Sequence, residues 1–347
     1  MASETNSTGG QRIEPKDLRC QERQDLEKIL PLDTPFVVYI EPTNVCNFRC
    51  QFCPTGDPDL LRRVGRPIAT MKLDVFKKIV DDLKAFPQKL KLLSLYKDGE
   101  PLVHKQFPEM VRYARDAGVA ERIWTKTNGS LLNPELNARI ADAGLDLISI
   151  SVEGVSREAY KRIADVDIDY DAFRRNLEDL YRQRGRMDVY VKIADSGLTS
   201  EEIEKFYADF GPMSTHIGVE KLMGWSYSGL KDFTLGTHPE TYDGLPLVPK
   251  DICAYPFYVL AVNANGAVSV CGNDWSHNTN VGNAFQTPLR DIWNGPSLRS
   301  FQLMMLEGRR CENKACADCY YLMIVPDNLD PFREPLLNRF RSAPLTR

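Results

Sequence analysis

The chain has 347 residues, of which 43% are hydrophobic and 27% are charged, and its formal net charge is -4. This balance is typical of a soluble globular protein, and the lack of a basic excess excludes a general binder of nucleic acid or of anionic membranes. The sequence shows neither an apolar run of the roughly 20 residues that cross a bilayer nor the apolar core of a signal peptide. We therefore expect a cytoplasmic protein, in which cysteines are more often metal ligands than disulfides.

The sequence divides into four expected parts, which are a tail and helix (1–34), a first domain (35–230), a second domain (231–330) and a C-terminal tail (331–347). In the first domain, strand patterns alternate with helix patterns. The expected strands are Phe36–Glu41, Leu90–Tyr96, Arg122–Thr127, Leu147–Val152, Val189–Ala194 and Ile217–Leu222. The expected helices span about 72–86, 105–117, 133–143, 156–183 and 199–210.

Six strand–helix units imply parallel strands that are joined by right-handed crossovers. Because six is fewer than the eight of a closed barrel, we predict an α/β fold with an open, partial (β/α)6 TIM-like barrel. The second domain begins with a loop over 231–252. A β-hairpin is then predicted over 257–271 around an Asn-Gly turn, and a helix at about 296–307. Ligands of such sheets bind at the C-terminal ends of the strands, so residues that follow the strands are the candidates for function.

The first strand is followed directly by CNFRCQFCP, which places Cys46, Cys50 and Cys53 in one loop at the mouth of the barrel. Three thiolates can hold three irons of a [4Fe–4S] cluster and leave the fourth iron open to an exogenous ligand. The alternatives are a redox Cys-x2-Cys pair and a zinc site. Zinc would need a fourth ligand, and the first histidine after the loop is the distant His104.

The loop resembles the Cys-x3-Cys-x2-Cys signature of the radical S-adenosylmethionine (SAM) enzymes, including the aromatic Phe52 before the third cysteine. The resemblance implies that the cluster injects an electron into SAM, which gives methionine and a 5′-deoxyadenosyl radical that abstracts hydrogen from a small-molecule substrate. It also implies an electron donor of the flavodoxin or ferredoxin type. The cofactors carry this chemistry, whereas the protein orients them and excludes water.

The stretch YKDGEPL (96–102) follows the second strand, where the radical SAM family carries a Gly-Gly-Glu-Pro-like segment that contacts the amino group of SAM. Gly99, Glu100 and Pro101 match this segment, whereas Asp98 replaces its first glycine. Carbonyls and a carboxylate suit a cationic ammonium, and glycine permits a close approach. The resemblance therefore implies that these three matching residues bind SAM.

Polar residues also end the third and fourth strands. Thr127 and Asn128 lie in TKTNG, where the family places polar groups against the ribose, and SISVEG places Ser151 and Glu153 on one face. Asn-Gly and Glu-Gly are also ordinary turns at strand ends. Because these polar strand ends surround one cysteine loop, we expect all four residues to bind SAM.

A second group of four cysteines lies in the second domain: Cys253, Cys271, Cys316 and Cys319. Four thiolates can fully ligate a second [4Fe–4S] cluster or a zinc ion. The arrangement resembles the SPASM/twitch class of radical SAM enzymes in its shorter twitch form, which implies an auxiliary [4Fe–4S] cluster. Cys20 is expected to pack in the leading helix. Cys311 is a candidate hydrogen donor to a product radical, a spare ligand or an inert thiol.

The resemblance to twitch-type dehydrogenases, such as those of 2-deoxy-scyllo-inosamine, implies the oxidation of a secondary alcohol of a sugar, an aminocyclitol or a related metabolite. A radical epimerase on a similar substrate is the first alternative, and it would need a donor such as Cys311. A peptide-modifying enzyme is the second. A zinc-stabilised or electron-transfer scaffold is the non-enzymatic alternative, but it would leave the open three-cysteine loop without a purpose.

Overall fold

The computed structural model describes residues 11–12, 24–227, 229–236, 241, 246–319 and 321–344. In this part of the chain, one sheet of ten strands has the order β1-β7-β6-β5-β4-β3-β2-β8-β9-β10. Its six central strands are parallel, which confirms the partial barrel. They are β2 (Val37–Ile40), β3 (Leu90–Ser94), β4 (Ala120–Thr127), β5 (Leu147–Val152), β6 (Asp188–Asp195) and β7 (His216–Lys221), and β1 (Gln11–Arg12) extends the β7 edge.

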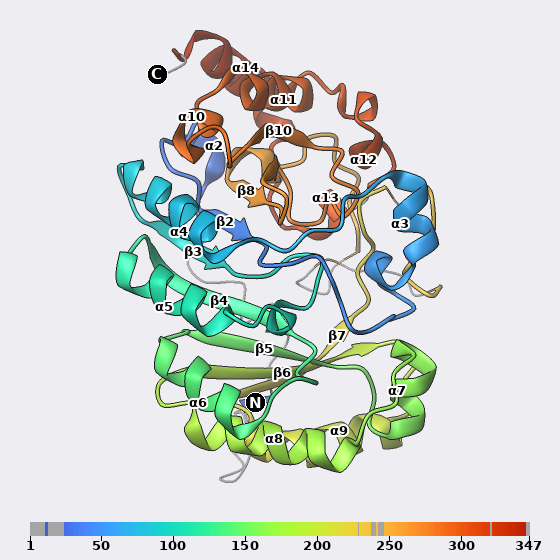
Figure 1. Ribbon diagram of the computed structural model, residues 1–347. Coiled ribbons are helices and arrows are strands. Elements are labelled where there is room, and N and C mark those ends of the chain that lie inside the picture. Colours follow the sequence, from blue (N-terminus) through green and yellow to red (C-terminus); the bar gives the residue numbers. More distant parts are fainter. Residues whose placement is uncertain are drawn as a thin grey trace.

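Alternate side chains of the central strands point to opposite faces of the sheet. On the outer face, apolar residues such as Val38, Ile150 and Val191 are fully buried in the main hydrophobic core. The same alternation places polar and aromatic side chains, such as Tyr39 and Lys192, on the inner face. The helices that pack outside the sheet (Figure 1) are α4 (Leu73–Asp82), α5 (Phe107–Ala117), α6 (Pro134–Ala143), α8 (Tyr170–Gln183) and α9 (Ser200–Phe210).

The single helix expected over 156–183 is wrong, because two helices occupy this stretch. Helix α7 (Arg157–Ala164) ends at Asp165, which has a left-handed φ of 50°. Helix α8 starts after Asp169, whose side chain accepts a hydrogen bond of 2.8 Å from the amide of Ala172. Asp favours such caps over helix interiors, so the acidic segment between the helices breaks the pattern. The end of α7 is thereby free to contact the cysteine loop.

The second domain continues the same sheet, which was not foreseen. The predicted hairpin is present as β8 (Val259–Val262) and β9 (Ala267–Ser269), and β10 (Asn280–Asn283) follows it. Strand β8 pairs in parallel with β2, so the second domain lies beside the strand that carries the cysteine loop. The remaining helices are α2 (Leu26–Ile29), α3 (Pro58–Val64), α10 (Leu289–Trp293), α11 (Pro296–Leu306), α12 (Lys314–Ala317), α13 (Tyr321–Ile324) and α14 (Arg333–Ser342).

A second, smaller core joins the segment just before β2 to the C-terminal helix α14. Leu336 and Phe340 of α14 are buried there beside Leu26 and Leu30, so the segment expected as a C-terminal tail contains a packed helix. Figure 1 shows α14 and α11 together at one end of the molecule. Cys20 lies outside the described residues, as do 237–240 and 242–245 of the expected loop.

Among the described residues, none of the helices has the length and apolar character that crossing a membrane requires.

Candidate functional site

The cysteine loop leaves the C-terminal end of β2 and is anchored on the end of α7. The amides of Arg49 and Gln51 donate hydrogen bonds of 2.9 Å to the carbonyls of Ala164 and Ile163. These bonds fix the backbone on both sides of the central cysteine of the loop. The helix break described above therefore has a direct role in shaping the loop.

The thiols of Cys46, Cys50 and Cys53 belong to half-buried residues that form no disulfide. Burial raises the pKa of Cys46 to about 12 and raises the pKa values of Cys50 and Cys53 above their usual range. The amide of Phe48 donates toward Cys46 Sγ at 3.4 Å, which favours the thiolate form. Iron binding to this loop must therefore displace protons. Three soft donors on one short loop suit three irons of a cluster.

The segment after β3 packs closely against the start of the cysteine loop. A Cβ on Gly99 would lie only 2.3 Å from the carbonyl oxygen of Thr43 and 2.7 Å from the backbone of Asn44. The amide of Glu100 donates a hydrogen bond of 2.9 Å to the carbonyl of Val45. A side chain at position 99 would push these two segments apart. The matching glycine thus has a packing role beside the loop.

The carboxylate of Glu100 joins the ends of β3 and β4. Its Oε1 accepts hydrogen bonds from Thr127 Oγ1 at 2.6 Å and from the amide of Leu102 at 2.9 Å, and its Oε2 accepts one from the amide of Asn128 at 2.7 Å. Pro101 follows directly and starts a short 3-10 turn. Burial raises the pKa of Glu100 to about 7. Because a carboxylate has about four acceptor positions, Glu100 mainly positions its neighbours and retains little capacity for a ligand.

The other predicted SAM contacts lie at the same edge of the sheet. Asn128 Nδ2 donates to Asn47 Oδ1 in the cysteine loop at 2.9 Å, and Ser151 is half-buried near the end of β5. Burial raises the pKa of Glu153 to about 7, and its side chain is hydrogen-bonded to Cys50. The structure therefore gathers these strand ends around the cysteine loop. Their contacts with SAM remain a prediction.

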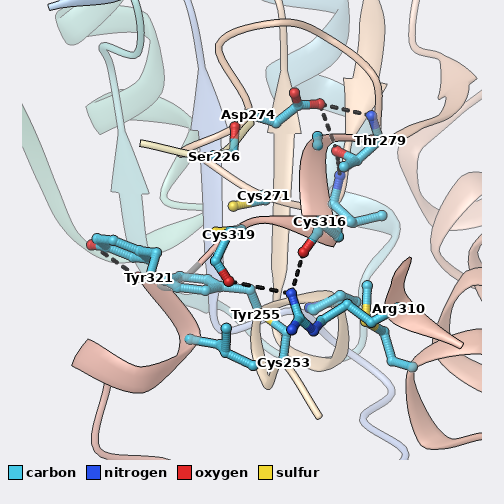
Figure 2. Close-up of a pocket in the computed structure, with 15 residues that line it drawn as sticks. Ser226, Cys253, Tyr255, Cys271, Asp274, Thr279, Arg310, Cys316, Cys319 and Tyr321 are labelled. Atoms are coloured by element: carbon cyan, nitrogen blue, oxygen red, sulfur yellow. Dashed lines mark hydrogen bonds between the residues drawn. The ribbon is translucent and has the colours of Figure 1, made fainter. Parts of the chain in front are cut away.

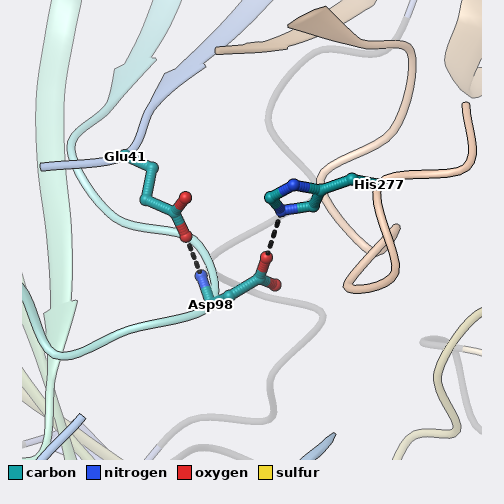
Figure 3. Close-up of side chains that lie close together, drawn as sticks. All are labelled: Glu41, Asp98 and His277. Carbon is teal, nitrogen blue, oxygen red and sulfur yellow. Dashed lines mark hydrogen bonds and ion pairs between the residues drawn. The ribbon is translucent and has the colours of Figure 1, made fainter. Parts of the chain in front are cut away.

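Asp98, which stands where the family motif has its first glycine, is the centre of a buried ion network. Its Oδ2 lies 2.5 Å from Lys97 Nζ and 3.7 Å from Arg66 Nη1. It also lies 3.4 Å from His277 Nε2, and Figure 3 draws this pair together with Glu41. Glu41, Asp98 and His277 offer ligand atoms within 4.8 Å of one another. Because Lys97 and Arg66 already balance the two carboxylates, a divalent cation there would be repelled. We therefore interpret this group as an ion network and not as a metal site.

The Asp98 network connects the two groups of cysteines. On one side, Thr55 Oγ1, next to the first cysteine loop, donates to the carbonyl of Asp98 at 2.8 Å. On the other side, Lys97 Nζ donates to the carbonyl of Asp274 at 2.9 Å, three residues after Cys271. Sequence reasoning recognised Asp98 only as a departure from the family motif.

The four cysteines of the second domain line one cavity, as the sequence predicts for a fully ligated cluster. Figure 2 shows Cys253, Cys271, Cys316 and Cys319 around this cavity together with Arg310. Burial raises the pKa of Cys253 to about 12 and raises those of the other three above their usual range. A closed set of four thiols fits a cluster whose irons are all held by the protein.

Cys311 does not line this cavity. It lies in a 3-10 turn (Arg310–Glu312) and is exposed at the surface. The structure thus places it apart from the four clustered cysteines. Its predicted role as a hydrogen donor gains no support from this position.

A pocket with a volume of about 120 Å³ is lined by residues of both the barrel and the second domain. The barrel contributes Tyr39, Tyr96, Lys97 and Lys126, and the segment after β7 contributes Trp225. The second domain contributes Gly272 and Asn273, directly after Cys271, and Tyr255 and Tyr321, each two residues after a cavity cysteine. From the sequence alone, the aromatic residues of GWSYSG (224–229) could belong either to a substrate pocket or to the core, which left Trp225 open. Sequence reasoning assigned no pocket role to the other lining residues.

Trp225 links the segment after β7 to the first cysteine loop. Its Nε1 donates a hydrogen bond of 2.9 Å to the carbonyl of Phe52. On the inner face of the barrel, Lys192 Nζ lies 2.6 Å from Glu220 Oε2, and Tyr190 donates to Glu220 Oε1 at 3.1 Å. The alternation of polar and apolar residues in β6 was a signal for this polar inner face.

The comparisons with known families match both parts of the site. Residues 40–210 match the radical SAM superfamily, and residues 253–320 match SPASM, an iron–sulfur cluster-binding domain. The chain belongs to the radical SAM superfamily. Its cofactors are therefore SAM and [4Fe–4S] clusters, with an auxiliary iron–sulfur site in the SPASM domain. The zinc scaffold considered from the sequence is thereby excluded.

Curated relatives of this radical SAM protein have varied names. It is 36% identical over 116 residues to the tungsten-containing aldehyde ferredoxin oxidoreductase cofactor-modifying protein of Pyrococcus furiosus, covering 33% of this chain and 30% of that protein. It is 24% identical over 188 residues to the AdoMet-dependent heme synthase of Methanosarcina barkeri, covering 53% and 50%. It is 30% identical over 175 residues to the GTP 3′,8-cyclase of Chlorobaculum tepidum, covering 49% and 48%. The chain thus spans half or less of these relatives.

Solved structures share the fold at low identity. BtrN in complex with AdoMet and 2-DOIA matches with a TM-score of 0.51 and 18% identity, covering 82% of this radical SAM chain and 92% of BtrN. SuiB of Streptococcus suis bound to the precursor peptide SuiA matches with a TM-score of 0.61 and 14% identity, covering 86% and 72%. One fold therefore serves proteins that bind very different partners.

Proposed function

We propose that this radical SAM protein oxidises a secondary alcohol of a small polar metabolite, such as a sugar or an aminocyclitol, to a ketone. The observation that carries the proposal is the place of the pocket. It opens between the strand ends of the barrel and the loops that hold the second set of cysteines. A substrate in this pocket would lie between the site that starts the radical reaction and a site that can accept an electron.

The lining of the pocket suits a ring that carries hydroxyl groups. Tyr39, Tyr96, Tyr255 and Tyr321 combine apolar ring faces with polar tips, and Lys126 adds a cationic group. Ring faces can pack against C–H groups, while the phenol oxygens can exchange hydrogen bonds with hydroxyls. The aromatic walls also exclude water from a reactive intermediate.

The residues of the chain have separate tasks in this reaction. When bound, SAM and its cluster supply a radical that removes one hydrogen atom from the carbinol carbon, and the auxiliary cluster supplies an acceptor for one electron. The resulting substrate radical loses the hydroxyl proton and that electron, and a ketone is formed. Cys46, Cys50 and Cys53 would hold the first cluster, and the four cavity cysteines would hold the second. Gly99 and Glu100 would keep the strand ends in register beside the first.

The proposal includes an electron donor of the flavodoxin or ferredoxin type. Each reaction cycle begins with one electron delivered to the first cluster, and small iron–sulfur and flavin proteins supply electrons at the low potentials that this step needs. Reduction by flavodoxin in place of dithionite would test this part alone. Loss of SAM cleavage with every such protein would contradict it.

The epimerase alternative differs from the proposed oxidation in the fate of one hydrogen atom. An epimerase must return hydrogen to the substrate radical, and the exposed position of Cys311 does not favour it as the donor. A peptide substrate is the second alternative, because SuiB was solved with a precursor peptide. At 14% identity, that likeness extends to the fold and no further.

The test is anaerobic turnover with polyols and aminocyclitols that carry deuterium at the carbinol carbon. We expect deuterium in 5′-deoxyadenosine and one ketone formed for each SAM cleaved. A product that is epimerised without net oxidation would favour the first alternative. If short peptides become labelled or cross-linked while every polyol fails, the proposal is wrong.

A further inference from the structure

Arg310 contacts the loop that carries two of the auxiliary cysteines. Its Nη1 donates hydrogen bonds to the carbonyl of Cys316, to that of Ala317 at 3.1 Å and to that of Cys319 at 3.2 Å. Figure 2 shows the guanidinium beside these carbonyls at the edge of the cavity. One side chain therefore binds three carbonyls of the short turn that carries this cysteine pair.

The local sequence explains why an arginine is needed there. The short helix α12 ends at Ala317, so the carbonyls of its last turn take partners from outside the helix, and that of Cys316 also accepts from the amide of Cys319 at 3.2 Å. A guanidinium presents several donors in a rigid fork, so it can satisfy neighbouring carbonyls at once, whereas a lysine ammonium is a flexible point charge. Arg310 thus fixes the separation of the Cys316 and Cys319 thiols before any cluster binds.

The charge of Arg310 also acts on the cavity. Arg310 lines the same cavity as Cys253, Cys271, Cys316 and Cys319. The carboxylate of Asp274 also lines the cavity, but it accepts hydrogen bonds from Thr279 at 2.7 and 2.8 Å. Both charges therefore lie beside the cysteines, and Arg310 is the one cationic side chain among the residues that line the cavity.

We propose that Arg310 is a positioning residue that presets the Cys316–Cys319 turn and raises the reduction potential of the auxiliary cluster. Reduction adds one negative charge to a cluster, and a fixed positive charge nearby stabilises the reduced form. A higher potential makes the site a better acceptor of the electron that leaves the substrate. This last consequence rests on the proposed alcohol oxidation, but the potential itself does not.

The test uses the full chain with Cys46, Cys50 and Cys53 replaced by Ala, so that the auxiliary cluster is measured alone. In this background, Arg310→Gln removes the charge and the fork, and Arg310→Lys keeps the charge only. Arg309→Gln is the matched control, because Arg309 is exposed and pairs with Glu307 and Glu312 at 2.9 and 2.7 Å. The midpoint potential is read by EPR during a redox titration after the iron content has been measured.

We expect the reduction equilibrium of Arg310→Gln to fall at least tenfold, which is a shift of about 59 mV for a one-electron couple. Arg310→Lys should lose some iron but stay near the parent potential, and Arg309→Gln should match the parent in both. A potential of Arg310→Gln equal to that of Arg309→Gln would overturn the charge effect, as would a tenfold fall in Arg310→Lys. If neither Arg310 variant holds iron, the effect on the potential is withdrawn. Because no substrate is added, failure of the alcohol oxidation would not alter this result.

Discussion

The two groups of cysteines use the same side chain to build two different kinds of site. The first uses three thiols from one eight-residue loop, which is held by the end of α7 and by Gly99. The second uses four thiols that lie far apart in sequence and meet in one cavity. We propose that the first set leaves one iron of its cluster without a protein ligand, whereas the second set leaves none. On this proposal, the incomplete ligand set binds a cosubstrate and the complete one exchanges electrons.

The largest effect is expected from removing one thiol from the first group of cysteines. Cys50→Ala removes one of three iron ligands, so SAM cleavage should fall to background, a loss of more than about 10³-fold. Iron should fall from about eight to about four per chain, because the second cluster remains. Cys311→Ala is the control and should keep both. Normal cleavage in Cys50→Ala would contradict the assignment of the loop.

Removing one thiol from the second group of cysteines should uncouple SAM cleavage from ketone formation. Cys316→Ala should also lower iron to about four per chain, but 5′-deoxyadenosine should still form at a rate within a few-fold of that of the parent. Ketone formation should be lost, because the substrate radical has no electron acceptor. Parallel measurement of 5′-deoxyadenosine and ketone decides the question, and equal loss of both products would argue against separate roles.

A change at the link between the two sites should destabilise the whole protein. Asp98→Asn leaves Lys97 and Arg66 buried without a full counter-charge, which costs about 3–5 kcal/mol in the free energy of unfolding. Asp142→Asn is the control, because the Asp142 side chain is 81% exposed in its pair with Arg112, and it should cost less than about 1 kcal/mol. Denaturant unfolding of the apo proteins measures both values.

The pH dependence of the Asp98 effect has a definite sign. Burial acts to raise the pKa of Asp98, but the charges of Lys97, His277 and Arg66 outweigh burial and hold it below its ordinary 3.8. The stabilisation by Asp98 is therefore fully present above about pH 4 and is lost as the pH falls further. The difference between the parent and Asp98→Asn should shrink below that pH. A constant difference down to pH 2 would contradict this account.

The smallest effect is expected at Gly99, where the backbone packs closely against the start of the first cysteine loop. Gly99→Ala would bring a methyl group against the backbone of Thr43, and such crowding costs about 1–3 kcal/mol. SAM affinity and iron at the first site should fall while the auxiliary cluster is unaffected. Gly211→Ala is the control, because Gly211 has a helical φ of -53° and no neighbour within 4 Å of an added Cβ. Equal behaviour of the two variants would remove the packing role of Gly99.

The barrel could be predicted from the sequence because the patterns that indicate it lie close together along the chain. Period-two strands and the spacing of Cys46, Cys50 and Cys53 lie within short windows of sequence, and the six expected strands are present in the structure. The four distant cysteines could be grouped by count and position, but the choice of an iron–sulfur cluster over zinc for them came from the family resemblance. The helix break at Asp165 was missed because capping by nearby acidic residues competes with an apolar pattern that continues beyond it.

Features that depend on tertiary contacts could not be predicted. The pairing of β8 with β2 joins strands that are more than 200 residues apart. The Asp98 network gathers Arg66, Lys97 and His277 from three segments, and the pocket takes its walls from both domains. No spacing rule links such residues, because their proximity is fixed by the packing of the sheet and its loops.

The most direct test of the open and closed sites is the effect of SAM on the EPR spectrum of each cluster by itself. The reduced cluster is measured in Cys316→Ala for the first site, and in the triple variant of Cys46, Cys50 and Cys53 for the second. SAM should change the spectrum in Cys316→Ala and leave that of the triple variant unchanged. A response at the second site, or silence at the first, would contradict the division of roles between the two sets of cysteines.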